Sequence, residues 1–364
     1  MWNLSKYDSL EALKTPMIKE TLPRYAAIIT NGLPAKYLIA KRIVVEFDKS
    51  MSNDELWAEH DTLMHKFHQI QTAIDQKKLD MAELEEPRFS LLDLKILLAE
   101  EMLKSCNLCE RRCRVDRTAG KLGECKVPTM ENCTISSENI HLGEEAHIVP
   151  SHTIFFMGCN FHCQYCQNWT ISQWQEAGDI VPAGILAKAV RIRKRDGARN
   201  VNWVGGEPTP QLFCILKTLR ILDVNTPQIW NSNFYMSDET MKLLDGLVDM
   251  YLSDFKYGND ECAFRLSKAG NYFDIVSRNH LAAVKQAELT IRHLVLPDHV
   301  ECCTKPVFDW IAENIRDRAI VNIMDQFYPA YRAYEYVNLK RRVNEDEMKE
   351  ALNYAEKLKL KYVS

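Results

Sequence analysis

The 364-residue chain lacks any long apolar run. No stretch approaches the roughly 18 consecutive apolar residues that suggest a membrane span, so we predict none. The first residues, MWNLSKYDSLEALK, carry charges early, which argues against a secretory signal. Charge of one sign is not in excess either, and the net charge of −4 gives no sign of a nucleic-acid partner. We therefore expect a cytoplasmic protein without a membrane partner.

Cysteine is absent and glycine is scarce in the first part of the chain, residues 1–104. Apolar residues recur at helical spacing over Asp54–Lys78 and Ser90–Lys104, whereas Tyr37–Phe47 fits a helix or a strand equally well. No catalytic motif is found there. We expect a mostly helical N-terminal domain over residues 1–104.

Seven of the twelve cysteines fall in two clusters with metal-ligand spacing, which favours a reducing compartment over a disulfide framework. The first cluster lies in a segment that we place at residues 105–150. Four thiolates in so short a stretch predict a closed zinc site or an auxiliary iron–sulfur cluster, and we take zinc first. Its members are Cys106, Cys109, Cys113 and Cys125.

The second cluster has the spacing C-x3-C-x2-C and consists of Cys159, Cys163 and Cys166. It follows Thr153–Met157, a β-branched and aromatic run that predicts a buried strand. A [4Fe–4S] cluster is normally held by four cysteines, so three in one loop leave one iron open to another ligand. Zinc is the alternative, but His162 is poorly placed to be a fourth ligand.

The remaining cysteines give weaker signals. Cys133, Cys214 and Cys262 stand alone, and lone cysteines are mostly small buried hydrophobes. Cys302 and Cys303 form an adjacent pair after a predicted strand, and we expect a structural role for them as well.

From residue 151 to the end of the chain, strands alternate with helices. The predicted strands are Thr153–Met157, Asn200–Val204, Gln228–Ser232, Met250–Phe255, Leu289–Leu296 and Ala319–Asp325. The predicted helices are Ala183–Arg195, Gln211–Leu222, Asp238–Leu247, Phe273–Ala287, Thr304–Ile315 and Asp346–Leu358. Six such units predict an α/β fold with a parallel sheet, whose chemistry lies at the carboxyl ends of the strands.

Several polar motifs fall at these strand ends. Gly205-Gly206-Glu207 follows the second strand, and its glycines would let a ligand approach the backbone closely. Lys256 and Arg292 follow the fourth strand and lie in the fifth, and a cation with a guanidinium suits a carboxylate. The alternative for both is a salt bridge lining the barrel.

The CNFHCQYC loop and the later GGE turn resemble the signature of the radical S-adenosylmethionine (AdoMet) enzymes. The resemblance implies a partial (β/α)6 TIM-like barrel with a [4Fe–4S] cluster, whose open iron binds the amino and carboxylate groups of AdoMet. It also implies that Tyr165 lies beside the adenine and that the GGE turn contacts the amino group of AdoMet.

Within that superfamily, FFMGCNFHCQYCQN and LVLPDHVE resemble a poorly characterised branch related to the pyruvate formate-lyase activating enzymes. The subgroup usually has an aspartate of a cation site at the place of Asn231, and often a histidine at the place of Gln326. The resemblance implies a set of AdoMet-binding residues, namely Tyr165, Gly205, Gly206, Glu207, Asn231, Asn233, Asp254, Lys256, Arg292 and Gln326.

We therefore expect a radical AdoMet oxidoreductase that receives electrons from an external donor. Its radical would abstract a hydrogen atom from a substrate, which could be a glycyl residue of a partner protein. An alternative substrate is RNA, because Lys188, Arg191 and Arg193 give one predicted helix a basic character. The third hypothesis, which the motifs favour least, is a non-enzymatic iron–sulfur electron carrier.

Overall fold

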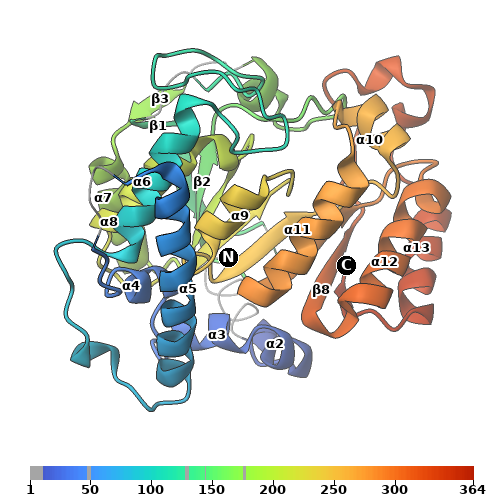
Figure 1. Ribbon diagram of the computed structural model, residues 1–364. Helices are drawn as coiled ribbons and strands as arrows, with labels where there is room; N and C mark the ends of the chain where they lie inside the picture. The colour runs from blue at the N-terminus through green and yellow to red at the C-terminus, as the bar shows by residue number, and fades with distance from the viewer. Residues whose placement is uncertain (1–10, 47–50, 128–130, 144, 175–177) are drawn as a thin grey trace.

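A computed structural model of the chain describes residues 11–46, 51–127, 131–143, 145–174 and 178–364. A nine-stranded sheet in the order β3-β1-β2-β4-β5-β6-β7-β8-β9 forms its centre (Figure 1). The strands are β1 (Cys133–His141), β2 (Ser151–Phe156), β3 (Asp179–Val181), β4 (Val201–Gly205), β5 (Gln228–Ser232), β6 (Met250–Asp254), β7 (Glu288–Leu294), β8 (Ala319–Met324) and β9 (Tyr362–Val363).

Six neighbouring strands, β2 and β4 to β8, are parallel, which confirms the predicted partial (β/α)6 barrel. Their bounds agree with the predicted ones to within two residues. The sequence patterns did not reveal the three outer strands: β1 pairs antiparallel with β2 and β3, and β9 adds two residues beside β8. Because β1 lies within residues 105–150, the sheet extends into that segment. The division of the chain at residues 104 and 150 stays a prediction.

Helices cover the outside of the sheet and are also abundant in the N-terminal part. The outer helices are α7 (Ala183–Arg195), α8 (Leu212–Ile221), α9 (Asp238–Leu244), α10 (Asp260–Ser267), α11 (Tyr272–Gln286), α12 (Lys305–Asn314) and α13 (Glu345–Lys357). The N-terminal ones are α2 (Pro16–Thr21), α3 (Pro23–Ile29), α4 (Lys36–Ala40), α5 (Asn53–Asp75) and α6 (Leu91–Lys104). Among the described residues, no helix is both long and apolar enough to cross a bilayer.

The ambiguous segment Tyr37–Phe47 contains both kinds of structure, although Phe47 lies outside the described residues. Its first part belongs to α4, and Val44 then forms an isolated antiparallel bridge with Ser90. The short α4 was indistinguishable from a strand by periodicity because it is less than two turns long and wholly buried.

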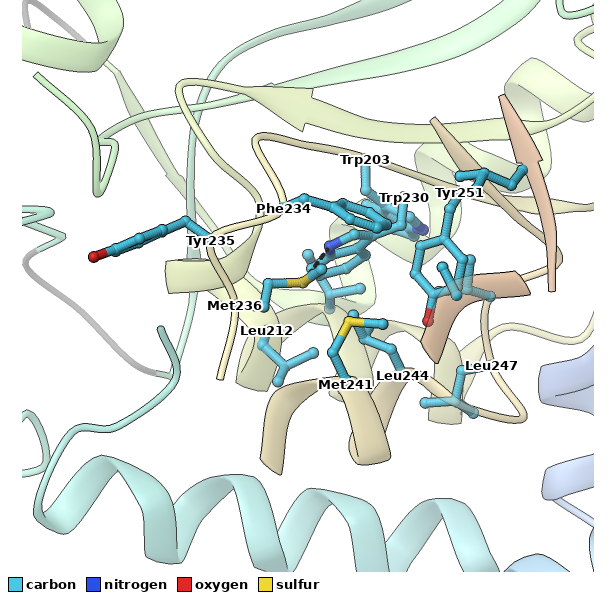
Figure 2. Packing of buried hydrophobic residues seen from close by; sticks show 14 of the residues in the cluster. Trp203, Leu212, Trp230, Phe234, Tyr235, Met236, Met241, Leu244, Leu247 and Tyr251 are labelled. Carbon is cyan, nitrogen blue, oxygen red and sulfur yellow. Dashed lines mark hydrogen bonds between the residues drawn. The ribbon is translucent and has the colours of Figure 1, made fainter. Parts of the chain in front are cut away.

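The aromatic layer between sheet and helices comes from alternate strand positions. Trp203, Trp230 and Tyr251 leave β4, β5 and β6 on the same side and pack among the apolar residues of α8 and α9 (Figure 2). The indole nitrogen of Trp230 lies 3.2 Å from Sδ of Met236. Since successive side chains of a strand point to opposite faces, Asn231 faces the interior of the barrel.

The amino-terminal end of the barrel is closed by α2 and α3, which lie below the sheet in Figure 1. A separate apolar cluster joins these helices to interior strand residues; it includes Ile18, Leu22, Tyr25, Ile229, Met250, Leu252 and Ile320. The backbone N–H groups of Arg24 and Tyr25 donate to the Glu288 carboxylate at 2.6 and 2.7 Å. The N-terminal segment is thus the floor of the barrel.

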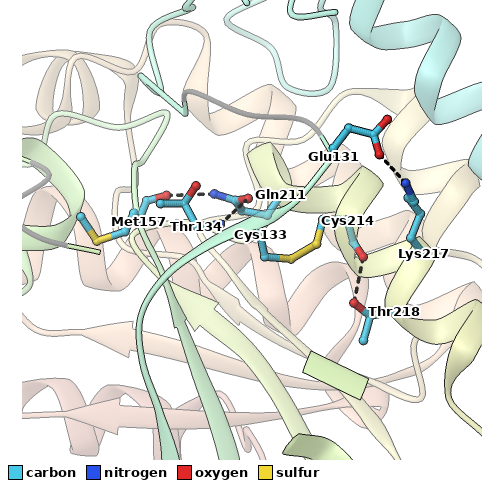
Figure 3. The surroundings of a disulfide bond; sticks show 8 residues. All are labelled: Glu131, Cys133, Thr134, Met157, Gln211, Cys214, Lys217 and Thr218. Atoms are coloured by element: carbon cyan, nitrogen blue, oxygen red, sulfur yellow. Dashed lines mark hydrogen bonds and ion pairs between the residues drawn. A yellow bond between two sulfur atoms is a disulfide. The ribbon is translucent and has the colours of Figure 1, made fainter. Parts of the chain in front are cut away.

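Two of the cysteines predicted to be isolated are in fact joined. Cys133 in β1 and Cys214 in α8 are both buried, as expected, but they form a disulfide (Figure 3). The side chain of Gln211 lies beside it, accepts from the N–H of Thr134 at 3.3 Å and donates to the Met157 carbonyl at 3.4 Å. These bonds tie β1 to the helical layer. The cysteines stand 81 residues apart, so no local pattern indicated the pair.

Candidate active site

The carboxyl ends of the parallel strands surround one cavity. It is lined by every residue that we predicted to bind the cluster or AdoMet: Cys159, Cys163, Tyr165, Cys166, Gly205, Gly206, Glu207, Asn231, Asn233, Asp254, Lys256, Arg292 and Gln326. Strands β2, β4, β5, β6 and β7 and the loop after β8 thus bring together residues that are up to 167 positions apart in the sequence. The individual roles of these residues stay predictions.

The three cysteines lie on the loop that follows β2 and are held by hydrogen bonds to their sulfur atoms. The N–H of Phe161 donates to Cys159 at 3.3 Å, and the Ser267 hydroxyl donates to Cys163 at 3.0 Å. Burial raises the pKa of the Cys163 thiol to about 11, although the Lys256 ammonium opposes that rise. Metals bind thiolates, so loading this loop must release protons.

The two glycines of the GGE turn are required by the neighbouring strand. Gly205 has φ +120°, and a Cβ there would lie 2.1 Å from the backbone nitrogen of Phe156. A Cβ on Gly206 would lie 2.0 Å from the carbonyl oxygen of Gly158. We expected the glycines to admit a ligand; the structure shows that they admit the backbone of β2 and of the loop that carries the cysteines.

Glu207 ties the end of β4 to the end of β5. Its buried carboxylate accepts hydrogen bonds from the Thr209 hydroxyl at 2.6 Å, the Ser232 hydroxyl at 2.7 Å and the N–H of Asn233 at 2.9 Å. Burial raises the pKa of this carboxyl, and the three donors oppose the rise. These bonds fix the orientation of Glu207 in the cavity wall before any ligand binds.

The charged residues of the cavity form ion pairs. Lys256 Nζ lies 2.7 Å from Asp254 Oδ2. Burial lowers the pKa of Lys256, but the Asp254 carboxylate and the Cys163 sulfur together outweigh this, so the pKa is raised and the ammonium stays charged. Arg292 Nε lies 3.6 Å from Glu145 Oε1, which also accepts from Asn322 at 2.6 Å. No sequence motif pointed to Glu145, which comes from the loop before β2.

Other lining residues differ in how they are partnered. Asn231 Nδ2 is buried without a hydrogen-bond partner, so it is available to a ligand. The hydroxyl of Tyr165 lies 2.6 Å from that of Tyr257, which fixes the ring in the wall. Gln326 is exposed at the rim, where its backbone carbonyl accepts from Gln167 Nε2 at 2.9 Å. Three soft thiols, a free amide donor and paired cations fit an iron–sulfur cluster with AdoMet.

The four cysteines of the first cluster also surround a common cavity, together with Arg111, Arg112 and Arg117. Arg111 Nε donates to the backbone carbonyl of Asn160 at 2.8 Å. Asn160 Oδ1 accepts from Asn233 Nδ2 at 2.6 Å, and Asn233 lies 3.8 Å from the Cys159 sulfur. The two cysteine clusters are therefore neighbours connected by Asn160. Only the position of Asn160 directly after Cys159 could have signalled this in the sequence.

A parallel partial barrel with three thiols on the loop after its first strand defines an enzyme class that pairs a cluster with AdoMet. Residues 153–311 match the Radical SAM superfamily, and the chain belongs to it. The sequence is 47% identical over 345 residues to "Uncharacterized protein MJ0674" of Methanocaldococcus jannaschii, covering 93% of this chain and 98% of that protein. It is 24% identical over 247 residues to "Uncharacterized protein MJ0808" of the same organism, covering 62% and 71%.

Among solved structures, Streptococcus suis SuiB bound to its precursor peptide SuiA is similar, with 16% identity and a TM-score of 0.44. The match covers 57% of this chain and 46% of SuiB, so the chain corresponds to less than half of that protein. Membership of the superfamily implies radical AdoMet chemistry with a [4Fe–4S] cluster and AdoMet as cofactors.

Proposed function

We propose that the protein is a radical AdoMet oxidoreductase in which Cys159, Cys163 and Cys166 hold the cluster. When bound, the cluster and AdoMet supply reductive cleavage by one external electron and a 5′-deoxyadenosyl radical that takes a hydrogen atom from the substrate. One observation carries the proposal: all thirteen predicted cofactor residues line a single cavity at the carboxyl ends of the strands.

The polar residues of the cavity wall support specific contacts with AdoMet. Lys256 and Arg292 attract the methionine carboxylate, and Asp254 orients Lys256 through their 2.7 Å ion pair. Asn231 offers its unpartnered amide N–H to an acceptor of the ligand. Asn231 lacks the negative charge that an aspartate would bring to a cation, so we expect no monovalent-cation requirement.

We propose further that the substrate is a glycyl residue in a partner polypeptide, as in the activating enzymes. The motif resemblance supports this, and so does an aromatic cluster next to the lining residues Gln167 and Gln173. Trp169 stacks on Tyr331 with 5.7 Å between ring centroids, and Trp174 packs on Trp169 at 4.3 Å while remaining 58% exposed. Exposed aromatic rings at the mouth suit a polypeptide segment lying across it.

We also propose that Cys106, Cys109, Cys113 and Cys125 hold an auxiliary iron–sulfur cluster, the second of our two alternatives. A tetrahedral zinc site with Zn–S bonds of about 2.3 Å needs sulfur–sulfur distances of about 3.8 Å. Among the described residues, no three of these four sulfurs lie within 4.8 Å of one another. The link through Asn160 supports a relay that passes electrons from the external donor to the AdoMet-binding cluster.

The test uses the full chain purified and reconstituted without oxygen. We expect 5′-deoxyadenosine when dithionite and AdoMet are added, and about eight irons per chain for two [4Fe–4S] clusters. Cys166→Ala should remove the product. Equal product from Cys166→Ala and the wild type would refute the assignment of the AdoMet-binding cluster. A count of about four irons with zinc at the four-cysteine site would refute the relay alone.

The glycyl substrate is tested separately in an anaerobic extract of the source cells. We expect an AdoMet-dependent organic radical whose EPR doublet collapses when the cells are grown on glycine deuterated at the α carbon. A modified RNA in place of that signal would favour the alternative substrate. In α7, however, Arg191 and Arg193 already pair with Asp223 and Glu138 at 2.7 and 2.8 Å, which reduces the basic surface available to RNA.

A further inference from the structure

A third group of metal-ligating side chains lies outside both cysteine clusters. It consists of Cys262 in α10 together with His299 and Cys302, whose ligand atoms all lie within 4.8 Å of one another. The sulfur atoms of Cys262 and Cys302 are 3.9 Å apart, and those of Cys302 and Cys303 are also 3.9 Å apart. The side chain of Cys303 also hydrogen-bonds the Cys262 thiol. Two cysteines and one histidine thus converge from two segments of the chain, and the Cys303 sulfur lies beside that of Cys302.

His299 is held in the form that a metal ligand requires. Its Nδ1 donates to the Pro297 carbonyl at 2.6 Å, which leaves the lone pair on Nε2. Donors from Arg265 Nη2 at 3.1 Å and Asn338 Nδ2 at 3.4 Å confirm that Nε2 is an acceptor. A backbone carbonyl bound to the second ring nitrogen is the usual partner of a metal-ligating histidine.

The backbone around the group is shaped to bring the two segments together. Cys302 and Cys303 lie in a π-helical turn, Val300–Thr304, a conformation that is rare and frequent at functional sites. Asn259 accepts from the N–H of Cys262 at 2.8 Å and donates to the Cys302 carbonyl at 2.7 Å. A Cβ on Gly258 would lie 2.8 Å from the carbonyl oxygens of both Cys302 and Cys303, so only glycine allows this approach.

We propose that Cys262, His299, Cys302 and Cys303 bind a zinc ion. Three thiolates and one imidazole are a common structural zinc ligand set. The two sulfur–sulfur distances of 3.9 Å match the roughly 3.8 Å expected for tetrahedral Zn–S bonds of about 2.3 Å. A cluster would place each thiolate on a different iron and so spread the sulfurs further. Three thiolates with Zn²⁺ carry one net negative charge, which the guanidinium of Arg265, 3.1 Å from His299 Nε2, would offset.

The ion would anchor one end of α10, whose other end holds the AdoMet-cluster loop. At that end Ser267 donates to the Cys163 sulfur at 3.0 Å. The carbonyls of Ser267 and Leu266 accept from the N–H groups of His162 and Gln164 at 3.0 and 2.8 Å. The zinc would therefore be structural, and it would help to hold the cysteine loop in place.

The first experiment measures zinc and iron together in the full chain purified without oxygen. We expect about one zinc per chain in the wild type. Cys262→Ser and Cys302→Ser should each lose it while the iron content remains. Cys113→Ser should do the reverse and lose iron while keeping zinc. A wild-type chain without zinc, or Cys262→Ser and Cys302→Ser variants that keep it, would overturn the proposal.

A second measurement avoids the risk that a variant fails to fold. Cys302 is exposed, so iodoacetamide should reach it in the metal-free chain. In the wild type we expect Cys302 to resist alkylation, and to be alkylated once a chelator has removed the zinc. Equal alkylation before and after zinc removal would contradict the site. A disulfide among Cys262, Cys302 and Cys303 in the anaerobic protein would also contradict the zinc site and would indicate a redox-active cysteine pair.

Discussion

The two ends of the barrel are built from the same strands but differ in the polarity of the strand residues that face the interior. On β5, Ile229 belongs to the apolar floor, and Asn231, two residues further on, lines the cavity. On β6, Leu252 and Asp254 repeat this relation. Positions two apart face the same side of a strand, so both pairs point into the barrel. The interior therefore changes from apolar to polar within two residues along each of these strands.

The difference teaches where this chain places stability and where it places chemistry. The floor is covered by the helices α2 and α3. Its described apolar cluster contains none of the buried side-chain atoms that lack a hydrogen-bond partner. The cavity holds paired charges, crowded thiols and the unpartnered amide of Asn231. Barrels of parallel strands separate these roles in the same way. Changes at the floor should thus lower stability and leave activity unchanged, whereas changes at the cavity should lower activity without lowering stability.

The largest effect is expected from a change at the cavity. Cys163→Ala removes one of three thiols, and 5′-deoxyadenosine formation should fall to background because the loop can no longer hold the cluster. The unfolding free energy of the metal-free chain should change by less than about 1 kcal/mol, since the change removes a single sulfur atom from a residue that is not fully buried. Chemical denaturation and product analysis check both halves. A large loss of stability would contradict the idea that the cavity contributes to activity and the floor to stability.

The sequence predicted the cavity end of the barrel better than the floor. The strands could be placed because β-branched and aromatic runs alternate with amphipathic helices, and the cavity followed because parallel strands end at one edge. The floor could not be predicted, because its partners are far apart: Tyr25 contacts strand residues more than two hundred positions away. The Cys133–Cys214 disulfide and the Glu145–Arg292 pair were missed for the same reason.

The next effect belongs to the floor. Leu22 is fully buried between α2 and α3, and Leu22→Ala should cost about 2–5 kcal/mol of unfolding free energy by leaving a cavity. The KM for AdoMet should not change. Denaturant melts and AdoMet cleavage rates check the prediction. Ile185→Ala is the matched control, because Ile185 is 58% exposed and its loss should cost no more than about 0.5 kcal/mol. A raised KM in Leu22→Ala would show that the floor does reach the site.

A smaller effect is expected from the ion pair at the end of β6. Lys256→Met keeps the length of the side chain but removes the charge that we assign to the AdoMet carboxylate. Losing a charged hydrogen bond of about 1.5–3 kcal/mol should raise the KM for AdoMet roughly 10- to 100-fold. Lys285→Met on the exposed surface of α11 is the control and should leave KM unchanged. An unaltered KM in Lys256→Met would reduce its pair with Asp254 to a structural salt bridge.

The smallest effect gives the sharpest test, because stability and binding should move in opposite directions. Asn231 Nδ2 is buried without a partner, and an unmade hydrogen bond of this kind costs free energy. Asn231→Leu is similar in volume and removes the unpartnered group, so the metal-free chain should gain about 1 kcal/mol of stability. The same change should weaken AdoMet binding, measured by calorimetry on the cluster-loaded protein. If Asn231→Leu instead lowered both stability and AdoMet binding, Asn231 would have a structural partner. The unpartnered amide would then not be a polar group that the cavity keeps for binding at a cost in stability.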